Sequence, residues 1–143
     1  MPTTQLINAL TGKKVLLVDD EPDSLDVAAT LLRMSEAEVI TAVSGTDGFA
    51  KAKEHRPLFI ISDLSMPGMD GWELLKAIKR DESVSDIPVI ALTAHAMPGD
   101  RRKALHAGFS NYLTKPLQPE TFVGNLIRLV MDTPQIAMRI NQS

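Results

Sequence analysis

Cysteine is absent from this chain of 143 residues, and basic residues are in slight deficit. Without cysteine, the chain cannot form disulfides, bind zinc through thiolates or use a thiolate nucleophile. The formal net charge of −3 gives no basic stripe, so binding to nucleic acid is not expected. No apolar run approaches the length of a membrane span, and the first residues lack the features of a secretion signal. We therefore expect a cytoplasmic protein that does not enter the membrane.

The composition is that of an ordinary globular domain. Hydrophobic residues make up 44% of the chain and charged residues 23%, which argues against intrinsic disorder. A chain of 143 residues can bury a hydrophobic core, and its length favours one domain. Residues 1–12 are expected to be a frayed extension, and residues 132–143 a tail or linker too short for a second domain.

Short apolar runs alternate with helical patterns along the chain. The apolar runs predict strands at residues 14–19, 38–43, 58–63, 87–93 and 109–114. The helical patterns predict a helix that begins at Pro22 and further helices at residues 46–55, 71–82, 98–108 and 119–132, the first of these capped by Ser44. Five β–α units with largely apolar strands predict a doubly wound α/β fold, in which helices cover both faces of a parallel sheet. Periodicity alone does not give the order of the strands.

Polar side chains gather where the predicted strands end. The first strand ends in Asp19 and Asp20, the third in Asp63 and the fourth in Thr93, and Lys115 follows the fifth. In a doubly wound sheet, ligands bind outside the carboxyl ends of the strands, so these side chains are expected at one rim. The three carboxylates together carry −3, which a divalent cation and one lysine would balance. Oxygen ligands of this kind, completed by water, suit Mg²⁺.

This set has the chemistry of a phosphoryl acceptor. A carboxylate such as Asp63 can act as a nucleophile and form an aspartyl phosphate, while a metal ion and a lysine offset the charge on the transferring oxygens. The Thr93 hydroxyl and loop N–H groups are candidates for binding the added negative charge. Taken singly, each acid is better explained as a turn residue or a helix cap. The presence of all of them at separate strand ends favours the phosphoryl-acceptor interpretation.

Four motifs in this order resemble those of the receiver domain of two-component response regulators. They are LLVDDEPDSL with Asp19 and Asp20, ISDLSMPGMDGWELL with Asp63, VIALTAHA with Thr93 and Ala94, and NYLTKP with Tyr112, Lys115 and Pro116. The similarity covers roughly residues 13–131, nearly the whole chain. The family implies a flavodoxin-like fold whose five-stranded parallel sheet has the order 2-1-3-4-5.

The resemblance also implies a role for each acid. Asp63 would be the phosphoacceptor. Asp20, Asp63 and the backbone carbonyl of Ser65 would bind Mg²⁺ directly, and Asp19 would act largely through water. The phosphoryl group would come from a histidine kinase or a phosphotransfer protein, and the product would bind a downstream protein target.

Further roles implied by the resemblance concern the switch. Lys115 would pair with the phosphoryl group, and its bond to Pro116 would be cis. Thr93 would hydrogen-bond a phosphoryl oxygen, and Tyr112, the one tyrosine, would be the switch aromatic on a face formed by the fourth helix, fifth strand and fifth helix. His95 would help tune the access of water. The same face serves many receivers for pairing, so a homodimer is one expectation.

Two other functions fit the sequence less well. A phosphatase of the haloacid dehalogenase type also combines an aspartate nucleophile, Mg²⁺ and lysine, but it needs a second acid two residues after the nucleophile, where this chain has Ser65. A flavodoxin needs a phosphate-binding loop after the first strand, where this chain has acids. We therefore expect a signalling module rather than an enzyme.

Overall fold

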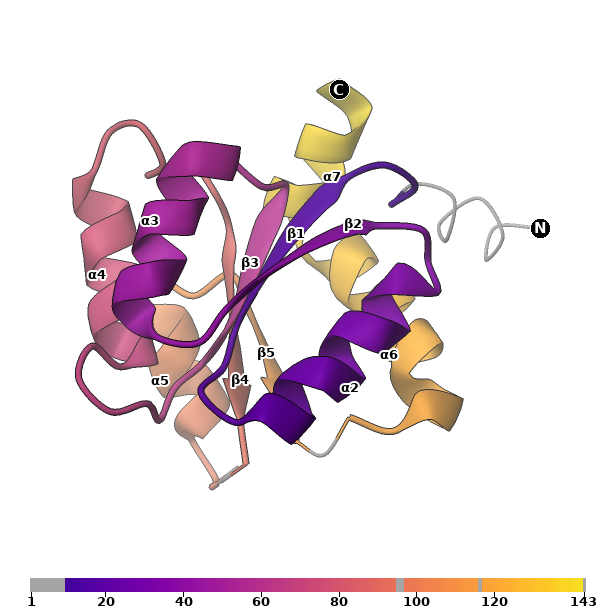
Figure 1. The fold of residues 1–143 in the computed structure, drawn as a ribbon, viewed down its shortest axis with the longest axis horizontal. Coiled ribbons are helices and arrows are strands. Elements are labelled where there is room, and N and C mark those ends of the chain that lie inside the picture. The colour runs from indigo at the N-terminus through magenta and orange to yellow at the C-terminus, as the bar shows by residue number, and fades with distance from the viewer. Residues whose placement is uncertain (1–9, 95–96, 116, 143) are drawn as a thin grey trace.

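The computed structural model of this chain describes residues 10–94, 97–115 and 117–142, and it shows an α/β fold (Figure 1). The strands are β1 (Lys14–Val18), β2 (Glu38–Ala42), β3 (Phe59–Asp63), β4 (Val89–Thr93) and β5 (Asn111–Thr114). The described helices are α2 (Pro22–Arg33), α3 (Gly45–His55), α4 (Gly71–Arg80), α5 (Asp100–Ala107), α6 (Pro119–Asp132) and α7 (Pro134–Gln142). All strands are parallel, in the order β2-β1-β3-β4-β5, which confirms the predicted topology.

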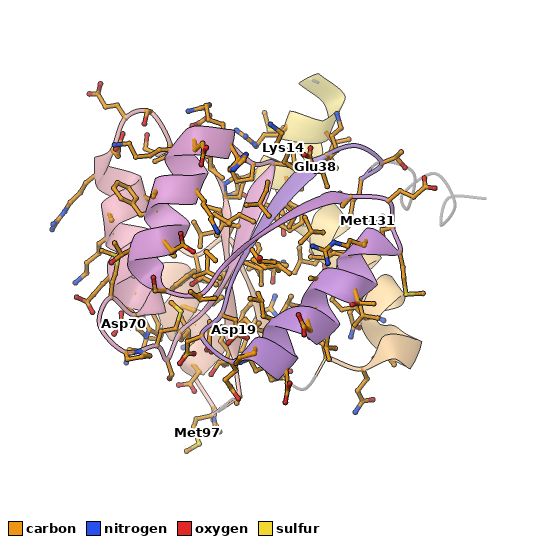
Figure 2. All side chains as sticks on the ribbon, viewed as in Figure 1. Lys14, Asp19, Glu38, Asp70, Met97 and Met131 are labelled. Carbon is orange, nitrogen blue, oxygen red and sulfur yellow. The ribbon has the colours of Figure 1, made fainter. Side chains whose placement is uncertain are left out.

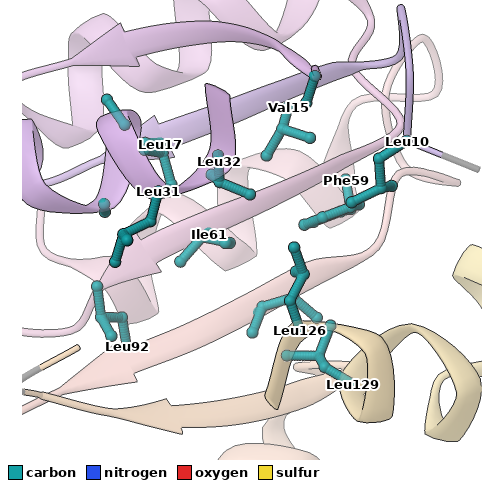
Figure 3. Packing of buried hydrophobic residues seen from close by; sticks show 14 of the residues in the cluster. Leu10, Val15, Leu17, Leu31, Leu32, Phe59, Ile61, Leu92, Leu126 and Leu129 are labelled. Carbon is teal, nitrogen blue, oxygen red and sulfur yellow. The ribbon is translucent and has the colours of Figure 1, made fainter. Parts of the chain in front are cut away.

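Both faces of the sheet are buried, because alternate strand residues point to opposite sides. Val15 and Leu17 of β1 belong to the core cluster shared with α2, α6 and α7, part of which Figure 3 shows. Leu16 and Val18 belong to the opposite cluster, shared with α3, α4 and α5. Close packing on both faces holds the ends of the strands in fixed positions.

Side-chain caps fix where two of the helices begin. Ser44 accepts a hydrogen bond from the Asp47 backbone amide at 3.0 Å and caps α3, as the sequence predicts. Asp70 and Glu73 form a reciprocal capping box at the start of α4. The second cap orients the loop between β3 and α4, and this loop follows Asp63 directly.

The predicted element boundaries agree with the structure within two residues, and two differences have a clear cause. Helix α4 ends at Arg80 rather than residue 82, because the Asp81 side chain accepts hydrogen bonds from the Ser83 amide at 3.0 Å and hydroxyl at 2.6 Å. Strand β5 begins at Asn111 rather than residue 109, because the Phe109 amide still bonds the last turn of α5.

Helix α7 occupies the segment expected as a tail or linker, and it packs against the sheet. Ile136 is fully buried in the core cluster that contains β1 and β3. Arg139 donates hydrogen bonds to the two backbone carbonyls that precede β3, those of Pro57 at 3.1 Å and Leu58 at 3.0 Å. At the other terminus, Leu10 is only 2% exposed in the same cluster, although the sequence suggests a frayed extension.

A buried polar contact fixes the junction between α6 and α7. The side-chain amide of Asn111 donates to the Thr133 hydroxyl at 2.9 Å, and that hydroxyl donates to the Leu129 carbonyl at 2.6 Å. Asn111 Oδ1 also accepts a hydrogen bond from the Tyr112 amide at 2.8 Å. The junction is thereby tied to the strand that carries Tyr112.

We expect Thr133→Val to lower the free energy of unfolding by about 1–3 kcal/mol, because the isosteric valine leaves the buried Asn111 amide without its acceptor. Urea denaturation measures this change. Thr30→Val, which alters an exposed threonine on α2, is the matched control and is expected to change stability by less than about 0.5 kcal/mol. Equal effects of the two substitutions would contradict a stabilising role for the junction.

Candidate functional site

Three carboxylates converge at the carboxyl edge of the sheet, as the sequence predicts. Asp19 and Asp20 follow β1, and Asp63 ends β3, the strand that pairs with β1. One oxygen of each carboxylate lies within 4.8 Å of the other two. Asp19 and Asp63 are buried and Asp20 is half-buried, and Figure 2 labels Asp19 at this edge. The convergence follows from the topology, because the carboxyl ends of neighbouring parallel strands lie side by side.

Asp63 is held in place by the loop that follows it. Its Oδ1 atom accepts a hydrogen bond from the Ser65 amide at 3.2 Å. The loop returns so closely that a Cβ at Gly71 would collide with the Asp63 carbonyl oxygen and the Leu64 Cα. Position 71 therefore requires glycine, a constraint that the sequence analysis missed. No local sequence pattern indicates this constraint, because it comes from the contact of the returning loop with the Asp63 and Leu64 backbone.

Lys115 lies between Asp19, which follows β1, and Asp63, which ends β3. Its Nζ atom is 2.9 Å from Asp19 Oδ2, 3.1 Å from Asp63 Oδ2 and 3.2 Å from Glu21 Oε1. The Lys115 side chain is only 10% exposed, whereas that of Glu21 is 66% exposed. The Lys115 amide donates to the Thr93 carbonyl at 2.7 Å, which continues the pairing of β4 and β5 and aims the side chain inward. Glu21, which the sequence analysis did not assign to the site, is a peripheral partner.

The acidic cluster fits a divalent cation. Asp19 Oδ1 accepts a hydrogen bond from the Glu21 amide at 3.0 Å. Asp19 Oδ2 is buried and, apart from its ion pair with Lys115, receives no well-directed hydrogen bond from the part of the chain that the structure describes. A buried carboxylate oxygen with an unused lone pair is suited to a cation or to its bound water. One lysine offsets only part of the charge on three carboxylates, which leaves a need for a cation. Because all the available ligands are oxygens, Mg²⁺ is the cation that this set would favour.

Burial and charge set the ionisation of Asp63. Burial raises the pKa of the Asp63 carboxyl above its usual value, and the charge of Asp19 acts in the same direction. The hydrogen bonds from Lys115 and from the Ser65 amide act against this rise. The carboxylate form of Asp63 is therefore less stable than that of an exposed aspartate. A bound cation would stabilise it.

The pKa values of Asp19 and Lys115 shift in the directions that keep both groups ionised. Burial alone would raise the pKa of Asp19, but hydrogen bonds from the Glu21 amide and from Lys115 bring it below the usual value. Burial opposes the charge on Lys115 as well, but its contacts with Asp19 and Asp63 raise its pKa. Among the three groups in direct contact, the charged forms of Asp19 and Lys115 are therefore favoured, and the carboxylate form of Asp63 is disfavoured.

The two residues assigned to the switch lie on adjacent strands. Thr93 ends β4 and is 6% exposed, and Tyr112 is half-buried on β5, where it packs against the cluster under α4 and α5. The Tyr112 hydroxyl is buried and has no hydrogen-bond partner among the described residues. Burial, followed by the charge of Asp100, raises the pKa of Tyr112. Apolar packing therefore holds the ring, and no hydrogen bond from the described residues holds its hydroxyl.

Two sequence-based expectations lie outside the described residues. These are the cis bond to Pro116 and the role of His95. Ser65 is exposed beside the site, with its amide bonded to Asp63. In the portion of the chain that the structure covers, every helix is too short or too polar to cross a membrane.

Comparison with known proteins identifies the family. The family model for the response regulator receiver domain matches residues 15–127. The polar-differentiation response regulator DivK of Brucella ovis is 35% identical over 111 residues, which cover 78% of this chain and 90% of DivK. Some relatives are longer: the chain is 33% identical to the transcriptional regulator RpaA of Synechocystis and spans 54% of its length.

Solved structures agree with this assignment. The chemotaxis protein CheY4 of Vibrio cholerae superposes with a TM-score of 0.75 at 34% identity, over 83% of this chain and 99% of CheY4. The receiver domain of the sensor histidine kinase PA1611 of Pseudomonas aeruginosa, which has a magnesium ion in its active-site cleft, superposes with a TM-score of 0.73 at 32% identity, over 85% of this chain and 99% of that domain. Fold, acidic edge and sequence together place this chain in the response regulator receiver domain family of two-component signalling.

Proposed function

We propose that this receiver takes a phosphoryl group onto Asp63 from a histidine kinase or a phosphotransfer protein and then alters its affinity for a downstream protein. The observation that carries the proposal is the buried contact of Lys115 with both Asp19 and Asp63, beside the third acid, Asp20. If Lys115 had only a structural role, one acid would be enough to balance its charge. Three acids around one lysine leave negative charge in excess, which suits a metal-assisted transfer.

Asp63 would act as the nucleophile. One of its carboxylate oxygens would attack the phosphorus of a phosphohistidine, the P–N bond would break, and the imidazole nitrogen would leave with the bonding electrons. Burial and the Asp19 charge disfavour the free Asp63 carboxylate, as its raised pKa indicates, and this supports its reactivity. Lys115 Nζ, at 3.1 Å from Asp63 Oδ2, is placed to stay with the transferred oxygens.

The metal site would use the residues expected from the sequence. Asp20, Asp63 and the backbone carbonyl of Ser65 would bind Mg²⁺ directly, and Asp19 would act through water. The unused Asp19 oxygen and the magnesium in the PA1611 receiver support this assignment. When bound, Mg²⁺ would offset the charge on the transferring oxygens.

The switch would follow from the new negative charge on Asp63. Thr93 would move toward the phosphoryl group, and the Tyr112 ring would enter the space that Thr93 leaves. The Tyr112 hydroxyl makes no hydrogen bond with the described residues, so no polar contact would oppose movement of the ring between an outward and an inward position. Tyr112 also lines a cavity of about 540 Å³ along α5, β5 and α6, and this face is where we place the downstream target or a second copy of the chain.

A signalling role accounts for the site better than hydrolysis of a substrate. Ser65 stands where a phosphatase of the haloacid dehalogenase type needs its second acid, and its side chain is exposed. A serine hydroxyl does not supply general acid–base chemistry near neutral pH. We therefore propose a cytoplasmic signalling module whose only chemistry is the formation and slow loss of its own phosphoryl group.

Incubation with Mg²⁺ and acetyl phosphate is expected to add one phosphoryl group to the parent chain, measured by intact mass spectrometry. Asp63→Asn is expected to gain none, because the amide is not a nucleophile for this transfer. Asp26→Asn changes an exposed aspartate on α2 and should gain mass like the parent. A parent chain that never gains mass, or an Asp63→Asn variant that does, would show that the acceptor is misassigned.

Lys115 places a positive charge beside the Asp63 carboxylate, which would also bind the cation, so Lys115→Met should have opposite effects on binding and on transfer. We expect Mg²⁺ to bind about three- to tenfold more tightly, because a competing positive charge is gone. Phosphoryl transfer should be slower by about a hundredfold or more, because charge stabilisation in the transition state is lost. Calorimetry measures the first effect and mass spectrometry the second, with the exposed Lys76→Met as control. Weaker Mg²⁺ binding together with an unchanged transfer rate would contradict this role of Lys115.

A further inference from the structure

A second pocket lies at the amino edge of the sheet, opposite the acidic site. It has a volume of about 430 Å³, and its lining residues are Gly12, Lys13, Lys14, His55, Arg56, Leu58 and Arg139. Figure 2 shows Lys14 and Asp19 at the two ends of β1, so one strand runs from this pocket to the acidic cluster. The pocket is built from four separate parts of the chain: the start of β1, the end of α3, the residue before β3, and α7.

The lining of this amino-edge pocket is basic. Four of its residues carry permanent positive charge, His55 can add another, and no carboxylate belongs to the lining. This concentration of charge is unexpected in a chain whose formal net charge is −3. Acids border the pocket. Asp86 pairs with both arginines, Glu54 contacts His55, Glu38 is the cross-strand partner of Lys14, and the Glu36 carbonyl accepts a hydrogen bond from the Gly12 amide.

Arg139 is held in place and still has hydrogen-bond donors to spare. Its Nε and Nη2 atoms donate to the carbonyls of Leu58 and Pro57, and Nη1 donates to Asp86 Oδ2 at 3.1 Å. A guanidinium has five N–H groups, so two remain after these contacts. Its side chain is 23% exposed, which is consistent with access from the pocket. An arginine fixed by backbone carbonyls is preorganised for an anion, because little side-chain entropy is lost on binding.

Two other cations of the lining make fewer contacts than Arg139. Arg56 uses one N–H group for Asp86 Oδ1 at 3.3 Å, and its side chain is 48% exposed. Lys14 is half-buried, and its cross-strand neighbour on β2 is Glu38. Hydrogen-bond donors on these side chains therefore outnumber the acceptors that the pocket lining offers. A multivalent oxyanion would supply the missing acceptors, since charge-assisted hydrogen bonds from arginine and lysine are the strong ones.

We propose that the amino-edge pocket binds the phosphate group of a small soluble molecule. A volume of about 430 Å³ holds a phosphate ester of modest size rather than a protein segment. Phosphate carries up to two charges and several acceptor oxygens, which matches a fixed arginine flanked by a second arginine and a lysine better than a single carboxylate does. The site is separate from the proposed phosphoacceptor, because different residues at the opposite edge form it.

Two-dimensional NMR of the ¹⁵N-labelled chain tests this proposal. Inorganic phosphate is titrated without Mg²⁺, and sodium chloride keeps the ionic strength constant. We expect saturable shifts of the amides of Lys14, Arg56 and Leu58. Asp63→Asn should bind phosphate like the parent, which separates this site from the acidic one. A parallel titration with AMP distinguishes the source: tighter binding of AMP would identify a nucleotide, and equal binding would identify the phosphate group alone.

Arg56→Gln and Lys14→Gln are each expected to weaken phosphate binding about three- to tenfold, which is the loss of one charge-assisted contact at a partly exposed site. Lys76→Gln removes the same charge from exposed α4, outside the pocket, and should leave binding unchanged. Melting temperatures confirm that each variant is folded. Shifts that do not saturate, shifts that chloride reproduces, or equal weakening by Lys76→Gln would overturn the proposal.

Discussion

The contact of Lys115 with Asp19 and Asp63 is the interaction on which the rest of this structure depends. Distances of 2.9 and 3.1 Å bring one lysine against carboxylates from two strands, at a site where the side chains are almost fully buried. Like charges this close repel, and without the lysine the buried acids would be strongly disfavoured. The lysine therefore stabilises the metal-free site, and it leaves negative charge in excess at this edge of the sheet.

The fold supplies the rigidity that this contact needs. Strand β3 is buried from Phe59 to Asp63, and core clusters on both faces of the sheet fix where it ends. Gly71 lets the following loop return against the Asp63 backbone. Helix α7 secures the other end of the same strand through Arg139. The Asp63 carboxylate therefore stands on a strand that is held at both ends.

Much of this arrangement could be predicted from the sequence, because the strands are short apolar runs and the acids follow them directly. Convergence of Asp19, Asp20 and Asp63 needed the parallel topology and the pairing of β1 with β3, and that strand order followed from the family resemblance. Other features depend on tertiary contacts that no local pattern shows. Helix α7 was missed because the segment is short, and only its packed position shows that Ile136 and Ile140 face the core. The need for glycine at position 71 appears only when the returning backbone is in place.

The most direct test of the account is a crystal structure of the chain grown with Mn²⁺, an oxygen-binding substitute for Mg²⁺ that gives an anomalous signal. We expect one anomalous peak bound by Asp20, Asp63 and the Ser65 carbonyl, with a water bridging to Asp19 and with Lys115 still contacting Asp63. Anomalous density elsewhere on the molecule, or none at this edge while the three carboxylates keep their positions, would contradict the central claim.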